Sequence, residues 1–148
     1  HPTLPMVYFS NEQGIGLSSY RREVNGQLKL EQDISILPPG MSKMGLSASD
    51  LLITPDGKFL FAGLRGHRQD FDRISRYRAL EDGKAEFLGL TEADQIPWGL
   101  TLSPDGKFLL VTATNGASLT AYRISKDGDL KKVASLAWDP RMSDLVTR

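Results

Sequence analysis

The feature that most constrains the fold is a segment that the chain contains twice. The sequence TPDGKFLFAG begins at Thr54 and SPDGKFLLVT begins at Ser103, so the run Pro-Asp-Gly-Lys-Phe-Leu recurs without change. The two copies start 49 residues apart. This spacing is that of one supersecondary unit rather than of a whole domain, and it predicts that the chain repeats a small structural unit.

Each copy carries the pattern of two strands joined by a tight turn. A short apolar run precedes the turn, at residues 51–54 and 100–103, and a second apolar run follows it. Proline fixes φ within the turn, and glycine tolerates positive φ. Segments of alternating polarity at 73–79 and 118–124 predict third strands, and AEFLGL and LKKVASL predict fourth strands. Four antiparallel strands in a repeat of this length are typical of a β-propeller blade.

The two ends of the chain fit the same template. The first residues align with the repeat after a shift of 53 positions, without a first strand, and Ser143 to Thr147 resembles Ser49 to Thr54. We therefore predict an all-β chain of about three propeller blades, each of four antiparallel strands. Because propeller rings have about 4 to 8 blades, this partial β-propeller is expected to need missing blades or a second copy of the chain to close the ring. Within residues 1–148, the predicted blades are 1–48, 49–97 and 98–142, followed by a closing strand at 143–148.

Composition excludes several classes of function. Lys plus Arg and Asp plus Glu both number 18, so the chain has no basic field for nucleic acid or for an anionic membrane surface. No apolar run approaches the ~20 residues of a membrane span. The absence of cysteine excludes disulfides and thiolate metal sites and is compatible with a reducing compartment, so we expect a cytoplasmic protein.

Short motifs add no cofactor or metal site. The segment GIGLSS, from Gly14, imitates the start of a dinucleotide fingerprint, but it joins two predicted strands and opens no helix. His67 and Asp70 could ligate a metal, but the chain has only two histidines and no cysteine to complete a site. We therefore expect neither a cofactor nor a metal.

Three longer segments carry a resemblance to a known family. SASDLLITPDGKFLFAGLRGH, LTLSPDGKFLLVTATNGASLTAYRI and HPTLPMVYFSNEQGIGLSSYR resemble consecutive blades of the seven-bladed propeller lactonases. Many propellers contain PDGKFL, whereas the NE of the segment that begins at His1 and the RGH that ends the segment from Ser47 are more specific. The family includes the propeller-type 6-phosphogluconolactonases, which use no cofactor, and, more distantly, fungal carboxymuconate-cyclising enzymes. The resemblance covers nearly the whole chain and implies the C-terminal three of seven blades.

The resemblance also implies a set of site residues at the top of the central channel. The acidic residue before the repeated strand corresponds to Asp50, the Arg and His of the family's RGH to Arg65 and His67, and the acidic residue of its NE to Glu12. Two features depart from the family pattern: Trp98 stands where the family usually has Arg, and the family's earlier His-bearing strand would fall before His1.

The residues by themselves leave structural alternatives open. Asp50 stands at the head of an apolar strand and could cap a turn instead of facing the channel. Arg65 and His67 could belong to a solvated loop that follows a strand. Glu12 occupies the position in its blade that Arg65 occupies in the next, so the two should line the same end of the ring. Opposite charges at one end favour a convergent polar cluster.

Two functional hypotheses follow. The first is a lactone hydrolase, most similar to 6-phosphogluconolactonase, in which acid–base side chains activate water and Arg65 binds an anionic sugar lactone. The second is a propeller that binds a partner without catalysis, since the fold alone does not determine function. A cyclase acting on a carboxymuconate-like substrate is a further alternative within the family.

Overall fold

The computed structural model describes residues 1–67, 70–138 and 144–147, and these residues form strands and no helix. It follows that no helix of the described residues could span a membrane. The strands are β1 Met6–Asn11, β2 Gly16–Arg22, β3 Leu28–Ser35, β4 Leu46–Ile53, β5 Phe59–Gly66, β6 Arg73–Ala79, β7 Ala85–Glu92, β8 Pro97–Leu102, β9 Phe108–Ala113, β10 Ser118–Ile124 and β11 Leu130–Ala137.

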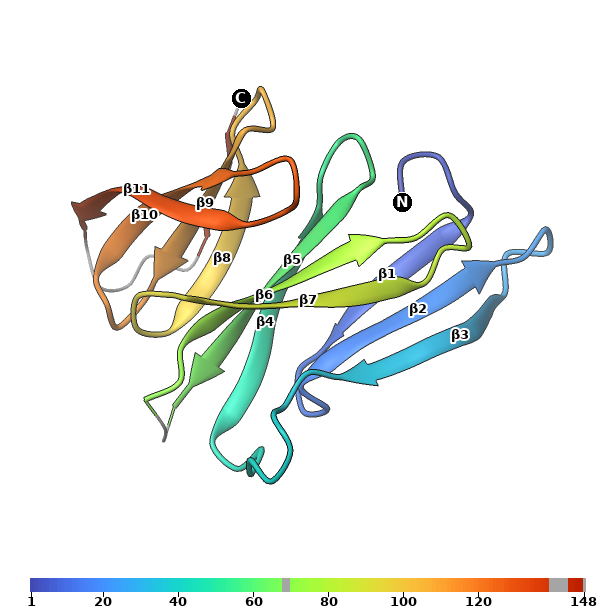
Figure 1. Cartoon of the computed structure of the whole chain (residues 1–148), viewed down its shortest axis with the longest axis horizontal. Helices are drawn as coiled ribbons and strands as arrows, with labels where there is room; N and C mark the ends of the chain where they lie inside the picture. The colour runs from blue at the N-terminus through green and yellow to red at the C-terminus, as the bar shows by residue number, and fades with distance from the viewer. Residues whose placement is uncertain (68–69, 139–143, 148) are drawn as a thin grey trace.

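The strands form three separate antiparallel sheets. Their strand orders are β1-β2-β3, β4-β5-β6-β7 and β8-β9-β10-β11, so each sheet is a simple meander of consecutive strands. Figure 1 shows the sheets side by side in chain order, with the β4–β7 sheet in the middle. The predicted all-β fold of propeller blades, with three, four and four strands, is confirmed.

Some predicted strand boundaries were wrong. The first strands begin earlier than expected, β4 at Leu46 and β8 at Pro97, and β5 continues to Gly66. Residues 144–147 of the predicted closing strand form no strand, while residues 143 and 148 lie outside the described residues. The physical reason is that a strand forms only where two backbones pair, and residues 144–147 pair with none of the described strands, although Thr147 Oγ1 donates to the Leu102 carbonyl oxygen at 2.6 Å.

The repeated turn is stabilised by a small hydrogen-bond network. Thr54 Oγ1 donates to Asp56 Oδ1 at 2.6 Å and accepts from the Phe59 N–H at 3.0 Å, while Asp56 also accepts from the Lys58 N–H. The second copy of the motif makes the same three bonds. Gly57 has a φ of 73°, a value that favours glycine. The recurrence of the motif therefore reflects one turn that the fold uses twice.

Apolar packing between neighbouring sheets forms the core. One cluster lies between the first and second sheets, and it includes the fully buried Tyr77 and Leu60. A second cluster lies between the second and third sheets, around Phe61 and Tyr122. Tyr77 and Tyr122 occupy the same position in their blades. The second and third blades thus use the same tyrosine position to pack against the preceding blade.

A polar cluster in the third sheet centres on Asp94, in the loop between β7 and β8. Its carboxylate accepts hydrogen bonds from Ser118 Oγ at 2.7 Å, from Thr120 Oγ1 at 2.5 Å and from Lys132 Nζ at 2.8 Å. Burial alone would raise the pKa of Asp94, but these hydrogen bonds outweigh it and lower the pKa to about 2. The loop that enters the blade is thereby bound to the blade's outer strands.

We predict that Asp94 makes stability depend on pH in the acid range. Its folded pKa lies below the ordinary value of 3.8, so its contribution is complete above that pH and is lost as the pH falls through about 2. The free energy of unfolding should therefore fall by on the order of 1 kcal/mol more in the wild type than in Asp94→Asn between about pH 4 and pH 2. Urea unfolding at each pH measures this difference. Equal slopes in the two proteins would contradict the role of Asp94.

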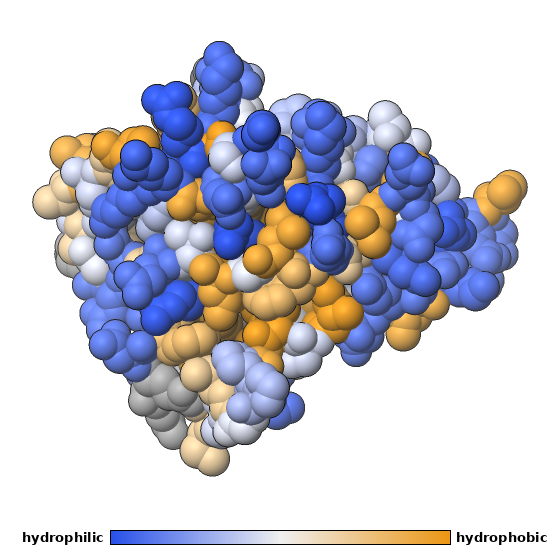
Figure 2. Space-filling model, viewed as in Figure 1, coloured by the Kyte–Doolittle hydropathy of each residue, from blue (hydrophilic) through white to orange (hydrophobic). Residues whose placement is uncertain are grey.

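We also predict that the isolated chain associates with itself or aggregates. Figure 2 shows apolar surface gathered over the middle of one face. The outer sheets expose further large apolar side chains, Phe9, Leu28 and Leu30 on the first and Val133 and Leu136 on the third, and Trp138 is exposed directly after β11. Exposed apolar surface of this kind favours association. Light scattering at increasing micromolar concentration tests this, and a monomer with a sharp melting transition throughout that range would argue against it.

Candidate active site

A cleft at one end of the blades brings together most of the residues that the sequence indicated. Its volume is about 600 Å³, within the usual range for small-molecule sites of roughly 300 to 1,000 Å³. All three sheets contribute to it. The lining residues are Ser10, Glu12, Ala48, Ser49, Asp50, Arg65, Trp98, Gly99 and Asp144.

Arg65 is the most constrained side chain of the cleft. Its Nη2 donates to Glu12 Oε1 at 2.8 Å and to the Ala48 carbonyl oxygen at 2.8 Å. The Trp98 ring centroid lies 4.2 Å from the Arg65 Cζ, a cation–π distance. Only 6% of the side chain is exposed, and the buried Nε has no hydrogen-bond partner among the described residues. Groups from three blades therefore hold this guanidinium in place.

The position of Arg65 in the strand decides between the two interpretations of the sequence. The sequence predicts that Arg65 follows a strand end, with a solvated loop as an alternative. The structure places it within β5, opposite Ser47 of β4, and buries it. The solvated-loop interpretation is thus wrong for Arg65. Pairing with the long strand β4 extends β5 beyond its apolar run, and this extension is what carries Arg65 into the sheet.

Glu12 and Arg65 meet as their shared repeat position predicts. Glu12 lies in the turn after β1, and its carbonyl oxygen accepts a hydrogen bond from the Ala48 N–H at 3.1 Å. Its side chain is 61% exposed, so one carboxylate oxygen contacts Arg65 while the group remains open to the cleft. This carboxylate is both fixed in position and accessible, which is the combination that a general base requires.

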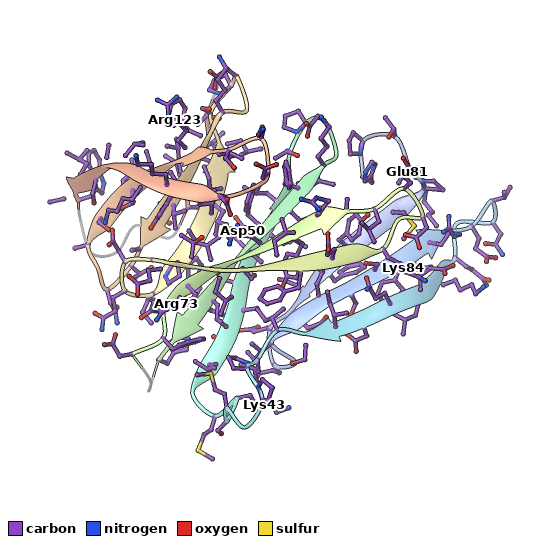
Figure 3. All side chains as sticks on the ribbon, in the orientation of Figure 1. Lys43, Asp50, Arg73, Glu81, Lys84 and Arg123 are labelled. Atoms are coloured by element: carbon purple, nitrogen blue, oxygen red, sulfur yellow. The ribbon has the colours of Figure 1, made fainter. Side chains whose placement is uncertain are left out.

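Asp50 joins two blades. Its Oδ1 accepts a hydrogen bond from the Leu51 N–H at 2.9 Å, and its Oδ2 accepts one from the Leu100 N–H of β8 at 3.0 Å. A bulge between Ala48 and Leu51 of β4 allows the side chain to reach across. Figure 3 shows Asp50 near the centre of the view, where the middle sheet meets β8. The Asp50 carboxylate therefore accepts two backbone hydrogen bonds and also lines the cleft.

His67 lies apart from the other three predicted residues. It is exposed, its Nε2 forms a hydrogen bond with Ser47 Oγ at 2.9 Å, and it is not among the residues that line the cleft. The structure therefore brings Asp50, Arg65 and Glu12 together but leaves His67 outside. The described residues contain no group of three or more side chains suited to hold a metal.

Sequence reasoning did not identify several cleft residues. Ser10 Oγ donates to the Ser49 carbonyl oxygen at 2.8 Å, and Ser49 Oγ donates to the Pro97 carbonyl oxygen at 2.8 Å, so a chain of hydroxyl bonds links β1, β4 and β8. Gly63 makes room for this chain, because a Cβ there would collide with Ser49 Oγ. The tripeptide Ser-Asp-Leu occurs at 49–51 and again at 143–145. This recurrence was the sequence signal that could have identified Ser49 as a cleft residue.

Comparison with known families identifies the fold and its family. The family model described as "Lactonase, 7-bladed beta-propeller" matches residues 1–141. The chain belongs to this family. In the lactonase family it is similar to the 6-phosphogluconolactonase of Pectobacterium carotovorum subsp. carotovorum strain PC1, with 28% identity over 140 residues, 93% of this chain and 41% of that protein. The 6-phosphogluconolactonase of Sodalis glossinidius strain morsitans is 30% identical over 111 residues, 74% of this chain and 32% of the relative.

Solved structures agree with the blade arrangement. The periplasmic gluconolactonase of Pseudomonas aeruginosa superposes with a TM-score of 0.82 at 23% identity, over 92% of this chain and 38% of that one. A protein from Lactobacillus plantarum gives a TM-score of 0.84 at 17% identity, over 95% of this chain and 40% of that one. These likenesses establish the fold. The chain spans less than half the length of the relatives and structures that it matches.

We predict that Asp50 stabilises the contact between the second and third blades. Asp50→Ala removes both acceptor oxygens and leaves the Leu100 N–H without its partner, which should lower the free energy of unfolding by about 1–3 kcal/mol. Asp127→Ala, at an exposed turn, is the control and should be nearly neutral. Urea unfolding measures both. If the two variants are equally stable, the Asp50 hydrogen bonds do not hold the blades together.

Proposed function

We propose that the cleft hydrolyses a sugar lactone. The observation that carries this proposal is the fixed guanidinium of Arg65 beside the accessible carboxylate of Glu12, in a chain of the propeller lactonase family. The names of the relatives support 6-phosphogluconolactone as substrate, with 6-phosphogluconate as product. The proposed setting is carbohydrate metabolism in the cytoplasm, with the pentose phosphate pathway as the context for the phosphorylated substrate.

The chemistry requires a base for water. The oxygen of a water molecule attacks the lactone carbonyl carbon, and a carboxylate takes the proton, a contribution of typically 10²–10⁴-fold. Glu12 and Asp50 both line the cleft and are the two candidates for this base. Asp50 already accepts two backbone N–H bonds, whereas Glu12 accepts one side-chain bond from Arg65. The ring C–O bond then breaks, and the departing oxygen takes a proton to give the open acid.

The carbonyl oxygen gains negative charge during this attack, and Arg65 is the group that can stabilise it. A cation that is held before the reaction needs little reorganisation as the charge develops. Arg65 meets that condition, since Glu12, the Ala48 carbonyl and the Trp98 ring hold it on three sides. His67 has no part in this scheme because it lies outside the cleft.

The test is Arg65→Lys in the full-length propeller that contains this chain. Lysine keeps the charge but cannot reproduce the paired contacts of a guanidinium. We expect kcat/KM for lactone hydrolysis, measured above the spontaneous rate, to fall at least about tenfold, equivalent to ~1.4 kcal/mol of transition-state stabilisation. The melting temperature should change by no more than it does in the control variant described next.

Arg76→Lys is a matched control for this substitution. Arg76 is also largely withdrawn from solvent, with 13% of its side chain exposed, and its Nε also has no partner among the described residues. It also bridges two blades, through Asp129 Oδ1 at 2.6 Å, but it does not line the cleft. Its replacement should affect stability without affecting kcat/KM of the folded protein. If both variants lose activity equally, or if neither does, Arg65 has only a structural role. A propeller with no lactonase activity at all would instead support a binding function without catalysis.

A further inference from the structure

A buried carboxylate, that of Asp72, lies outside the cleft. Asp72 stands directly before β6, next to Arg73, which Figure 3 labels. It is only 5% exposed, and it is not among the residues that line the cleft. A carboxylate is costly to bury unless hydrogen bonds compensate for the water that it loses. The bonds that Asp72 accepts therefore indicate what it does in the molecule.

One oxygen of Asp72 joins the two segments that carry Arg65 and Trp98. Its Oδ1 accepts a hydrogen bond from the Gly66 N–H at 3.0 Å and another from the Ile96 N–H at 2.9 Å. Gly66 directly follows Arg65 at the end of β5. Ile96 stands two residues before Trp98, at the entry to β8. Because both bonds share one acceptor atom, they fix these two stretches of backbone relative to each other.

Ile96 has a backbone conformation that requires such support. Its φ is 61°, and a β-branched residue rarely adopts a positive φ. Strained conformations of this kind persist where the surrounding structure fixes them. The Ile96 N–H donates to Asp72, its carbonyl oxygen accepts from the Thr114 N–H at 3.0 Å, and its side chain is buried. The turn that leads into β8 is therefore held on both sides.

The Trp98 ring transfers this arrangement to the guanidinium. Pro97, directly before it, accepts a hydrogen bond from Ser49 Oγ at 2.8 Å through its carbonyl oxygen. The ring then lies over Arg65, with 4.2 Å between its centroid and Cζ. An aromatic ring over one face and the Glu12 carboxylate at one edge limit the rotation of the guanidinium. A fixed orientation is what stabilisation of a developing oxyanion requires.

The other described blades have no carboxylate at the position of Asp72. Ile15 directly precedes β2, and Ala117 directly precedes β10, as Asp72 precedes β6. The blade can therefore form without an acidic residue here. The carboxylate occurs in the blade that carries Arg65, which favours a role connected with the site.

We propose that Asp72 is a positioning residue for the cleft, which acts by holding the Trp98 ring over the Arg65 guanidinium. The inference rests on the proposed function, because the guanidinium that it orients is the group assigned there to the developing oxyanion. Asp72 and Arg65 belong to the second blade and Trp98 to the third, so the shared oxygen acts across the contact between these two blades.

The test is Asp72→Ala in the full-length propeller that contains this chain. Loss of the shared acceptor should lower kcat for lactone hydrolysis at least about tenfold and change KM less than about threefold, because the guanidinium acts mainly in the transition state. Asp72→Asn keeps an acceptor oxygen and should keep kcat within about threefold of the wild-type value. Equal losses in the two variants would overturn the role of the shared acceptor.

Gln32→Ala is a matched control for the effect on stability. The Gln32 side chain also joins two blades, since it accepts from the Ala85 N–H at 2.8 Å and donates to the Ala85 carbonyl oxygen at 3.1 Å, but it does not line the cleft. Urea unfolding should show a loss of stability in both alanine variants, whereas kcat of the folded protein should fall only in Asp72→Ala. If kcat falls equally in both, or in neither, Asp72 has only a structural role.

Trp98→Ala tests the same arrangement at a residue that is 41% exposed and buries no polar group when it is removed. It should lower kcat as Asp72→Ala does, and Trp98→Phe, which keeps an aromatic ring, should lose less. The double variant with Asp72→Ala should lose no more than about twofold beyond either single variant, because both changes disrupt one arrangement. Losses that multiply would overturn the proposal. So would an unchanged kcat in Trp98→Ala, even where Asp72→Ala fails to fold.

The failure of this inference can be told apart from the failure of the proposed function. A wild-type propeller that hydrolyses no lactone would overturn the proposed function and this role with it. An active wild type whose Asp72→Ala and Trp98→Ala variants keep their kcat would overturn this inference alone.

Discussion

The site depends on apolar packing between neighbouring blades. Each sheet satisfies its interior backbone hydrogen bonds within itself, so nothing in the strand pairing of one blade positions the next. The relative position of the blades follows from the two buried clusters between them, where side chains such as Phe61 and Tyr77 are almost completely removed from water. Burying a side chain of this size contributes about 1.5–3 kcal/mol. The cleft exists because this packing brings three blades together.

Polar contacts add direction to this packing. Apolar surfaces can slide against each other, whereas a hydrogen bond between blades fixes one atom against another. Asp72, buried between the second and third blades, accepts hydrogen bonds from the N–H groups of Gly66 and Ile96. Asp50 makes the corresponding link to Leu100. Such buried or partly buried links set the position of β8 relative to β4 and β5, and therefore the position of the Trp98 ring over Arg65.

The properties of the cleft follow from this arrangement. Arg65 alone, on an exposed strand end, would be a mobile cation able to bind any anion. Held between Glu12, Ala48 and Trp98, it becomes a fixed charge that is largely withdrawn from solvent. Fixing the guanidinium before the reaction favours stabilisation of a developing oxyanion. The contacts of Arg65 thus support the proposed chemistry.

The sequence alone determined the blades, because they depend on local features. The turn at Pro55 and Asp56 and the alternation of residues 73–79 predict strands within a single repeat, and these strands are present. The meeting of Glu12 and Arg65 was also predictable, since repeat positions superpose. Only the tertiary structure decided which side chains face the cleft. His67 lies outside it, because β5 extends to Gly66 by pairing with β4; Trp98 and Asp50 line it, because the third blade packs against the second. These contacts join residues some 33 to 50 positions apart in the chain, and no local pattern specifies them.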